Sequence, residues 1–404
     1  MKLKLNHIKS FFILLPFFLV FIAEIISFRN QSLGSTLKLL AILFMFLYSI
    51  LHLKFDRKII VFFGVFIPVF FFHIYISFNL NAAIEEAIRY LFPVVVLFYG
   101  FSIRKHYLLV IYFIIGFAIL NNLYQPIVYF NWWREVPEQW FYYKVNNGGS
   151  YYFNSTMGVI RGVGLMGFFA SYGFLNLVSY FLVRQFYKGK YKKTILILLA
   201  LGVIMSLSFK ALGVFFLLLF VLNKHKTKFV MGGFCFVLLS IIIYPKKVLS
   251  FTDQLTMRIE VYITEGNSAR AESYRVMFED LTQFRILGRG VGSFGGASST
   301  KYNSPVYNEV DFNWYDTKHL ATTDTYFPHA FVELGLIGGG LYFLVVLSPL
   351  FKRYYKKEVL LTIFVIYFAL FFDSLFSFAL NNLGYLMISL VLVYPIIEYE
   401  KNII

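Results

Sequence analysis

The sequence has few charged residues and a single cysteine. Only 14% of its 404 residues are charged, whereas an ordinary soluble domain has about a quarter. With one cysteine, Cys235, the chain can form neither an intrachain disulfide nor a thiolate metal cluster. These two scarcities argue against a soluble globular domain and against a small scaffold held together by disulfides.

Motifs for metals and nucleotides are also absent from the sequence. The 7 histidines are scattered, without a His-Glu-x-x-His helix or a comparable ligand spacing. No glycine loop of the Walker or Rossmann type occurs. The formal net charge of +16 would suggest nucleic acid in a soluble protein, but much of it falls in short loops between apolar runs. We therefore expect no metal, no cofactor and no nucleic-acid partner.

Long apolar runs dominate the chain instead. Apolar residues make up 59% of it, and several runs reach the roughly 20 residues that cross a bilayer as a helix. We predict an all-α polytopic membrane protein in which residues 1–404 form one transmembrane domain of about twelve helices. The seventh and eighth runs are short and adjacent, so they fit either two crossings or one helix broken at membrane depth. The predicted spans are 10–28, 35–53, 59–78, 83–103, 107–128, 157–183, 194–208, 210–222, 228–244, 324–350, 359–377 and 382–398.

Lysine and arginine recur in every second connection between these spans, for example at Arg57, Arg104 and Arg184. Basic residues stay on the cytoplasmic side in short loops, so the alternation predicts that both termini face the cytoplasm. The first run lacks a small-x-small cleavage site and is predicted to be a retained span rather than a signal peptide. Two long segments then face the other side, 129–156 and 245–323.

Aromatic residues crowd the first external segment, 129–156, with Trp132, Trp133 and Trp140 among them. An interfacial belt would explain them, because Trp and Tyr gather at the level of the lipid headgroups. Stacking against sugar rings is the alternative, and the two interpretations are compatible.

The second external segment, 245–323, is far longer than a link between two helices needs, and such long connections are usually functional. Apolar residues at helical spacing from Ala271 to Leu281 predict an amphipathic helix of about fifteen residues along the membrane surface. A glycine-rich turn, 288–296, follows and could bring backbone N–H groups close to an anion. Arg285 and Arg289 flank this turn. We predict that this segment carries the chemistry and that it is partly helical.

Cations also occur within the predicted spans, where a membrane penalises them. Arg161 lies near the outer end of the sixth span, Lys210 lies between the seventh and eighth, and Arg89 lies in the outer half of the fourth. Arg89 is one turn from Glu85 and Glu86, so a local ion pair is an alternative to a site. A doubly charged anion on the external side would bring such cations together, and the planar fork of arginine suits phosphate oxygens.

Two stretches resemble the signature region of the O-antigen polymerase and O-antigen ligase superfamily of bacterial membrane glycosyltransferases. They are SARAESYRVMFEDLTQFRILGRGVGSF and DTYFPHAFVELGLIGG. In that family an arginine opens a helix, an aromatic residue follows four positions on, and Gly-x-Gly closes the helix, as Arg270, Tyr274 and the Gly288–Gly290 turn do here. The next span opens with His-Asn or Asp-Asn and continues to Glu-x-Gly-x-x-Gly, which Asp324 and Glu333 match. The family's Ser-Arg pair near the eighth span is not matched, because Phe209 follows Ser208 and Lys210 comes one position later. The layout covers the whole chain, and the motifs cover about 70 residues.

The resemblance implies glycosyl transfer from an undecaprenyl diphosphate-linked oligosaccharide at the outer face of the bacterial inner membrane. Fixed positive charge stabilises a leaving diphosphate, and the incoming hydroxyl needs a general base. The ligase branch has a histidine at the opening pair, whereas Asp324 stands there in this chain, which favours the polymerase branch. We predict a metal-independent polymerase of O-antigen or capsule repeat units, with the lipid-linked donor, the bilayer, a chain-length regulator and a flippase as partners. The predicted catalytic residues are Asp324, Arg270 and His329, and the predicted diphosphate-binding residues are Arg161, Lys210, Arg275 and Arg289.

Glu333 is predicted to be a structural charge. On a continuous helix it lies about 13 Å beyond Asp324 at 1.5 Å per residue, too far for both to reach one hydroxyl. We expect it to pair with Arg161 or Lys210, and Asp373 is the alternative counterion for these cations.

Three alternatives stay open. His329 could simply be a histidine at a helix start that bonds to backbone or water. The chain could be a ligase that transfers polysaccharide to a lipid A core. It could also be a flippase or transporter of a lipid-linked solute, although no inverted repeat of the kind many transporters have is visible.

Overall fold

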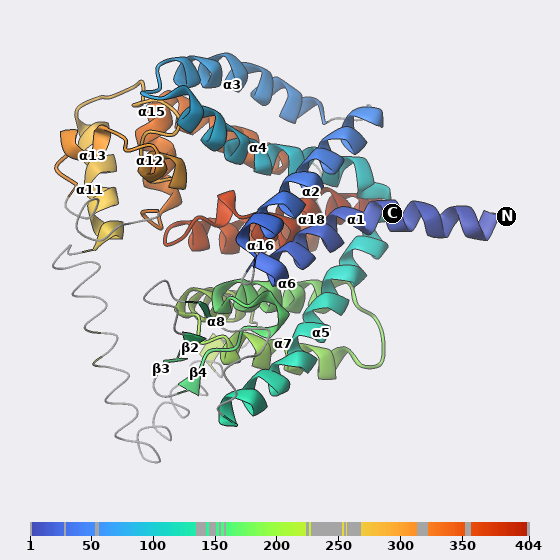
Figure 1. Ribbon diagram of the computed structural model, residues 1–404. Helices are drawn as coiled ribbons and strands as arrows, with labels where there is room; N and C mark the ends of the chain where they lie inside the picture. Colours follow the sequence, from blue (N-terminus) through green and yellow to red (C-terminus); the bar gives the residue numbers. More distant parts are fainter. Residues whose placement is uncertain are drawn as a thin grey trace.

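The structure is a computed structural model that describes most of the chain (Figure 1). The described residues are 2–27, 30–52, 56–134, 143–144, 151–152, 155–156, 159–223, 226–227, 253, 256, 268–312, 322–351 and 357–401. Cys235, Trp140 and the predicted span 228–244 lie outside these residues.

Long apolar helices form the first third of the chain. Asn30, Asp56 and Asn79 each begin a helix, because the side-chain oxygen accepts a hydrogen bond from an N–H of the first turn. The bounds agree with the first five predicted spans, except that the fifth helix continues to Trp133 and so takes up the start of the aromatic segment. The helices are α1 (Lys2–Ser27), α2 (Gln31–Leu51), α3 (Arg57–Tyr75), α4 (Leu80–Ile103), the 3-10 turn η1 (Arg104–His106) and α5 (Tyr107–Trp133).

The sixth predicted span, 157–183, is wrong at its start. Helix α6 runs only over Phe169–Phe186. A short antiparallel pair, β3 (Ser155–Thr156) with β4 (Val159–Ile160), and the turn η2 (Gly164–Met166) precede it. Gln125 of α5 holds this non-helical backbone, because its Oε1 accepts from the N–H groups of Val163 and Gly164 at 2.9 and 2.8 Å. A second two-residue pair, β1 (Tyr143–Lys144) with β2 (Tyr151–Tyr152), lies in the aromatic segment.

Two short helices follow, α7 (Lys192–Met205) and α8 (Phe209–Leu222). Leu207, in the left-handed region at φ 46°, turns the chain between them. The N–H of Gly162, just before α6, bonds to the Met205 carbonyl, whereas Arg184 near the end of α6 bonds to the Leu222 carbonyl. The start of α8 therefore lies near the start of α6, and the end of α8 lies near the end of α6. Since α7 ends where α8 starts and begins after the end of α6, α7 and α8 run in opposite directions. This favours two short passages over one broken helix.

Helices of the external segment and of the chain's last part complete the fold. The last predicted span, 382–398, is interrupted at Ser389, which has φ −121° and ψ −82°, and so forms two helices rather than one. The elements are α11 (Ala269–Thr282), α12 (Ala297–Lys301), α13 (Val306–Glu309), α15 (Tyr326–Leu347), η4 (Ser348–Phe351), α16 (Lys357–Ser374), η5 (Ala379–Asn381), α17 (Leu383–Ile388) and α18 (Leu390–Lys401).

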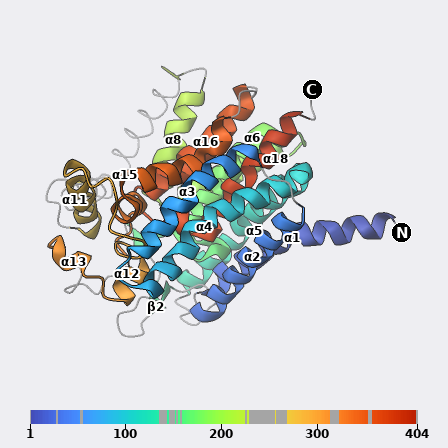
Figure 2. The same ribbon diagram turned by 90° about the horizontal axis from the view of Figure 1, so that it is seen from above.

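Helix α18 lies at the centre of the bundle and packs against α4, α5 and α16 (Figures 1 and 2). Its residues Leu390 to Tyr394 are completely buried. Gly100 of α4 permits the close approach, since a Cβ there would lie 2.7 Å from the Val391 carbonyl oxygen. Apolar packing of this kind makes the helices one body.

Six helical segments of the described residues are long and apolar enough to cross a membrane. The protein is therefore a helical membrane protein. One of the six segments, 80–133, contains both α4 and α5. Two shorter apolar helices, 209–222 and 359–374, accompany them. The six segments are Lys9–Ser27, Gln31–Leu51, Arg57–Tyr75, Leu80–Trp133, Tyr326–Phe351 and Leu383–Glu400.

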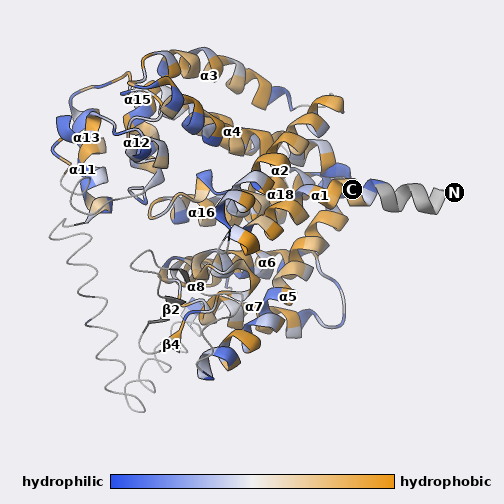
Figure 3. Cartoon of the chain, viewed as in Figure 1, coloured by the Kyte–Doolittle hydropathy of each residue, from blue (hydrophilic) through white to orange (hydrophobic). Residues whose placement is uncertain are grey.

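The two ends of the bundle differ in chemistry. At one end, which we call the basic end, Lys58 donates to the Phe351 carbonyl and Arg104 pairs with Glu398 at 3.4 Å. At the opposite end, which we call the loop end, α11, α12 and α13 cover the starts of α4 and α15 (Figure 1). Figure 3 shows hydrophilic residues on α11 and α13 and mainly hydrophobic ones on α1 to α3.

Candidate functional site

An ion pair joins the two motifs of the external segment at the loop end. Arg270 Nη2 lies 3.2 Å from Asp324 Oδ2, and their side chains are 34% and 59% exposed. Ser268 caps α11 and so fixes the first turn that carries Arg270. Asp324 immediately precedes Thr325, the residue at which α15 begins. The two predicted catalytic residues thus meet across 54 positions of sequence and remain open to solvent.

The backbone holds Asp324 in an unusual conformation. Its φ is 57°, in the left-handed region, which non-glycine residues seldom adopt and which costs on the order of 1–3 kcal/mol. Neighbours fix it there: the N–H of Thr323 bonds to the Gly295 carbonyl at 3.0 Å, and the Thr325 hydroxyl lies 2.6 Å from that of Ser273. Strain of this kind persists where the surroundings over-determine it, and it occurs often at functional sites.

Behind this pair lies a fully buried cluster of Glu86, His329 and Glu333. His329 Nε2 lies 3.2 Å from Glu86 Oε1, and His329 Nδ1 lies 3.6 Å from Glu333 Oε1. All three side chains are 0% exposed. The ring of Tyr90 stacks on the imidazole, with centroids 5.2 Å apart. His329 is therefore enclosed by two carboxylates and an aromatic ring and does not reach the surface.

The hydrogen bonds of His329 indicate its charge. Its Nδ1 lies 2.6 Å from the Phe294 carbonyl oxygen, and its Nε2 faces the Glu86 carboxylate. Because both nitrogens face acceptors, the contacts suit the doubly protonated, positively charged ring. With Arg89, two cations then balance the two carboxylates, as buried charges require. His329 is thus bonded to backbone, as the alternative interpretation expected, with two glutamates in addition, and its predicted catalytic role stays a prediction.

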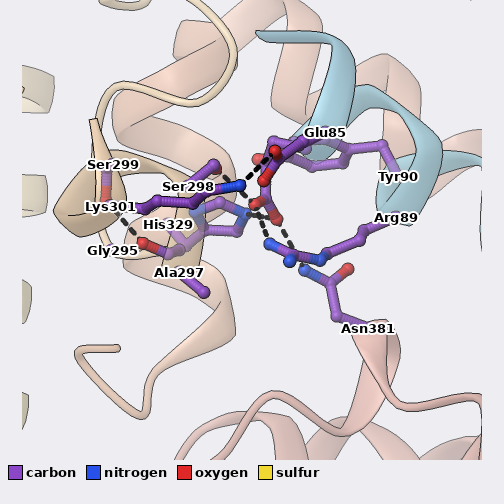
Figure 4. A network of polar contacts seen from close by, with 12 residues as sticks. Glu85, Arg89, Tyr90, Gly295, Ala297, Ser298, Ser299, Lys301, His329 and Asn381 are labelled. Carbon is purple, nitrogen blue, oxygen red and sulfur yellow. Dashed lines mark hydrogen bonds and ion pairs between the residues drawn. The ribbon is translucent and has the colours of Figure 1, made fainter. Parts of the chain in front are cut away.

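Glu86 is saturated with donors (Figure 4). Arg89 Nη1 donates to its Oε2 at 2.6 Å, and Ser298 Oγ donates to the same atom at 2.7 Å. Asn381 Nδ2 of η5 donates to Oε1 at 3.1 Å. The local ion pair expected for Arg89 is confirmed. The Glu86 carboxylate, which belongs to α4, thereby joins α4 to α12 and η5 through hydrogen bonds.

Glu333 does not pair with Arg161 or Lys210, so this expectation was wrong. Tyr90 Oη donates to its Oε2 at 3.1 Å, and the Phe294 N–H donates to its Oε1 at 3.0 Å. Segment 288–296 was expected to offer N–H groups to an anion, and the anion that Phe294 binds is this internal carboxylate. Glu333 lies one helical turn beyond His329 on α15, so it faces the same buried cluster.

A short path of backbone contacts connects the buried cluster to Asp324. His329 and Glu333 hold the carbonyl and the N–H of Phe294. The next carbonyl, of Gly295, accepts from the N–H of Thr323 at 3.0 Å, and Thr323 precedes Asp324. The cluster therefore positions Asp324 from behind, although none of its members contacts solvent.

Lys210 is held by Asp373, the alternative counterion considered from the sequence. Their Nζ and Oδ1 atoms are 2.6 Å apart, with side chains 21% and 4% exposed. Ser377 donates to the same carboxylate oxygen. This pair fixes the start of α8 to the end of α16 at the loop end.

Arg161 lies in the non-helical segment before α6 rather than within a helix. Its Nη2 donates to the Leu207 carbonyl at 2.6 Å, and its guanidinium carbon lies 3.2 Å from the centroid of the Phe169 ring. The residue is only 7% exposed. Arg161 thus contacts Leu207, which precedes Lys210 by three positions in the sequence.

Arg275 and Arg289 are engaged by carboxylates of the external segment. Arg275 bonds to Glu272 at 2.6 Å and Glu279 at 2.7 Å, and the Glu272 hydrogen bond raises the pKa of Arg275 further above its ordinary value. Arg289, with a side chain 8% exposed, lies 2.7 Å from Asp280. It also lies 2.9 Å from Glu309. Both arginines stabilise the external segment. The Arg275 side chain is 37% exposed, much like that of Arg270 at 34%, but two carboxylates hold it, and the Arg289 side chain is largely buried.

Tyr274 connects Arg270 to the Lys210 region. One turn along α11 from Arg270, its Oη donates to the Leu375 carbonyl at 2.8 Å, two residues beyond Asp373. Burial raises the pKa of Tyr274 to about 12, so it remains a donor at neutral pH. Arg270 and Lys210 are thus linked through the Tyr274–Leu375 hydrogen bond and the short chain segments beside it, and Arg161 is linked to the turn before Lys210.

No group of three or more His, Cys, Asp or Glu side chains in the described ranges is arranged to hold a metal ion.

The sequence analysis did not identify four partners of the buried cluster: Tyr90, Phe294, Ser298 and Asn381. Only Tyr90 had a usable signal, since it follows Glu86 by one helical turn and shares its face. The others depend on contacts between distant segments, which a single sequence does not reveal.

No protein-family model, curated protein or solved structure matches this chain.

Proposed function

We propose that this protein is a polysaccharide polymerase. It would transfer a glycan from one undecaprenyl diphosphate-linked oligosaccharide to another and so lengthen an O-antigen or capsule chain. The exposed Arg270–Asp324 pair carries the proposal. It brings the two stretches that resemble the polymerase and ligase superfamily together at one accessible point.

The proposed reaction uses Asp324 as a general base. A hydroxyl of the acceptor sugar attacks the anomeric carbon of the donor, and its proton passes to the Asp324 carboxylate. The bond between that carbon and the diphosphate oxygen breaks, and the lipid diphosphate leaves with the bonding electrons. Atoms and charge balance without a metal or cofactor.

Arg270 would meet the developing charge on the diphosphate, with Lys210 and Arg161 as the further predicted cations. An ion pair as exposed as Arg270–Asp324 contributes only about 0–1 kcal/mol. A diphosphate with two charges can therefore compete with Asp324 for the guanidinium, which leaves the carboxylate free to accept a proton. Arg289 would not be released in this way, because its guanidinium is 8% exposed and bound by two carboxylates.

The proposed location is the bacterial inner membrane, with the loop end on the outer side and both termini in the cytoplasm. The basic residues gathered at the opposite end support this orientation. The twelve-span layout is part of the same proposal.

The test is a gel of surface and lipid-linked polysaccharide from cells that lack this protein. The cells are complemented with the wild type, Asp324→Ala, Arg270→Ala or Lys301→Ala. Lys301 is the control, since it is another cation of this segment that is exposed, at 58%, and pairs with a carboxylate. We expect single repeat units on the acceptor with the deletion and the first two variants, and long chains with Lys301→Ala.

Other patterns would favour the alternatives. Long chains that accumulate on the lipid carrier beside a bare acceptor would indicate a ligase. Single units that never reach the outer face would indicate a flippase or transporter. Either pattern would refute the polymerase.

A further inference from the structure

Exposed apolar side chains gather directly after α11. Phe284 is 82% exposed, Ile286 46% and Leu287 50%, and Phe278 in the last turns of α11 is 57% exposed. Contiguous apolar patches on a surface mark a contact with another phase or partner.

Most of the apolar side of α11 does not contribute to this patch. Val276 and Met277 are buried in a small core with Val332 of α15 and Phe294. The sequence predicted that the apolar face of α11 would rest along the membrane surface; of that face, Met277 is covered by protein and Phe278 is exposed. The exposed apolar surface therefore begins in the last turns of the helix and continues beyond its end.

Backbone hydrogen bonds tie the segment 284–290 to an interruption in α15. Gly335 has φ 68°, which breaks the helix. The N–H groups of Arg289 and Gly290 bond to the carbonyls of Val332 and Glu333 at 2.8 and 3.0 Å. The segment thus satisfies backbone groups that the break would leave open, as a membrane helix requires.

Two glycines allow this contact. A Cβ on Gly335 would overlap the Ile286 carbonyl, and a Cβ on Gly288 would overlap the Glu333 carbonyl. Only bare backbone fits on both sides, and the hydrogen bonds of Arg289 and Gly290 hold the segment against α15.

The patch is continuous with surfaces of two candidate membrane helices. On α15, Leu336 and Ile337 are 52% and 47% exposed, and the Ile337 N–H reaches the Ile286 carbonyl at 3.4 Å. At the end of α3, the His73 carbonyl accepts from the Val291 N–H at 3.0 Å, and Tyr75 is 86% exposed. Both α3 and the segment containing α15 are apolar enough to cross a membrane.

We propose that Phe278 and residues 284–287 insert into the lipid at the loop end and anchor α11 to the membrane. The occupant of this surface is the acyl region of the bilayer just below the headgroups. Arg285 lies among the apolar side chains and is 43% exposed, and a long basic side chain at this level can extend its charge to the headgroups. The anchor keeps the helix that begins at Arg270 at the height of the membrane surface.

Site-specific fluorescence tests the insertion without any assay of activity. In a Cys235→Ser background, single cysteines replace Phe284 or Leu287 and receive an environment-sensitive fluorophore. Matched controls place the same fluorophore at Lys301 or Glu309, whose side chains are 58% and 56% exposed at the same end. The full-length protein is reconstituted into phosphatidylcholine vesicles, which receive either nitroxide-labelled lipid or aqueous iodide.

We expect nitroxide lipid to quench the fluorophores at 284 and 287 and iodide to quench those at 301 and 309. Equal quenching by iodide at all four positions would overturn the proposal and indicate an aqueous surface, open to a protein partner. Equal quenching by nitroxide lipid at all four would overturn it too, because the fluorophore and not the segment would then set the depth.

Discussion

The buried cluster of Glu86, His329 and Glu333 differs from the Arg270–Asp324 pair in what its charges can do. Every carboxylate in the cluster receives several hydrogen bonds, and none of its side chains is exposed. In the pair, Arg270 and Asp324 contact each other at 3.2 Å, Asp324 also accepts from the Thr322 hydroxyl, and both side chains are open to solvent.

The energetic consequences differ accordingly. Removing one partner of a buried pair leaves an uncompensated charge and costs about 3–5 kcal/mol, whereas an exposed pair contributes about 0–1 kcal/mol. These contacts suit the cluster to support of the fold and the pair to the proposed chemistry. An acid or histidine in a motif is thus not enough to assign a catalytic role, because its contacts and its exposure also bear on the assignment.

The substitution Asp324→Asn tests this division of roles with the largest expected effect. The change keeps the size of the side chain and removes the base, so we expect about a 10²- to 10⁴-fold loss of polymerisation rate. The melting temperature should not change. The polymerisation rate is measured with purified protein and a lipid-linked donor.

Asp311→Asn is the control for this prediction. Asp311 is another exposed aspartate of the external segment with a positive φ, 48°. It should retain the full rate. An Asp324→Asn protein as active as the Asp311→Asn protein would show that the carboxylate is not the base.

His329→Leu should do the opposite and act mainly on stability. It removes one of the two cations that balance Glu86 and Glu333, so one buried carboxylate loses its compensating charge, at a cost of about 3–5 kcal/mol in the free energy of unfolding. Thermal unfolding in detergent measures this, with the exposed His52→Leu as control. If His329→Leu unfolds like the wild type yet is inactive, the histidine takes part in the chemistry and our division of roles is wrong.

Gly335→Ala tests the support at the backbone level. Its φ of 68° and its contact with the Ile286 carbonyl penalise any Cβ, and the left-handed conformation alone costs on the order of 1–3 kcal/mol. Gly340, in the same helix, has nothing within 4 Å of a built Cβ. We expect Gly335→Ala to lower the melting temperature and Gly340→Ala to leave it unchanged or raise it. Equal melting temperatures would contradict the contact.

The smallest effect concerns Lys301, which lies 2.5 Å from Glu85. The hydrogen bond to Glu85 raises the pKa of Lys301 above its ordinary 10.5. Because the pKa of Lys301 is higher in the folded protein, its ion pair contributes fully to stability below pH 10.5. This contribution to stability disappears as the pH rises through the pKa of the folded state. Lys301→Met should therefore melt slightly lower than the wild type at pH 8 and equally at strongly alkaline pH. Lys105→Met, at the basic end, should show no such convergence.

Much of the architecture could be predicted because hydropathy and helix length are local properties. The first five helices agree with their apolar runs, and Arg89 pairs with its neighbour Glu86 as the spacing indicated. The start of α6 could not be predicted, because Gln125 of another helix holds that backbone open. The same limit applies to the partners of Glu333, one of which, Tyr90, is 243 positions away. Contacts between distant segments decide such details.

The motif also predicted the site only in part. It indicated that Arg270 and Asp324 belong together, and their contact agrees with that. Arg275 and Arg289 were grouped with them by charge alone. Their carboxylate partners, Glu272, Glu279, Asp280 and Glu309, were all visible in the sequence, but which cation they would occupy depended on the folded loop.

The shortness of α7 and α8 has a consequence for the surrounding membrane. Each has 14 residues and is therefore about 21 Å long at 1.5 Å per residue, against a hydrocarbon thickness of about 30 Å. In the proposed twelve-span layout both helices cross the membrane, and a bilayer beside them then has to thin locally, at a modest cost for each ångström of mismatch. We expect the protein to melt at a higher temperature in short-chain than in long-chain phosphatidylcholine bilayers, and the same temperature in both would contradict this. Lys210 lies at the start of α8, so the lipid headgroups of a thinned bilayer would lie closer to it. A charged lipid would then have a shorter path to the protein.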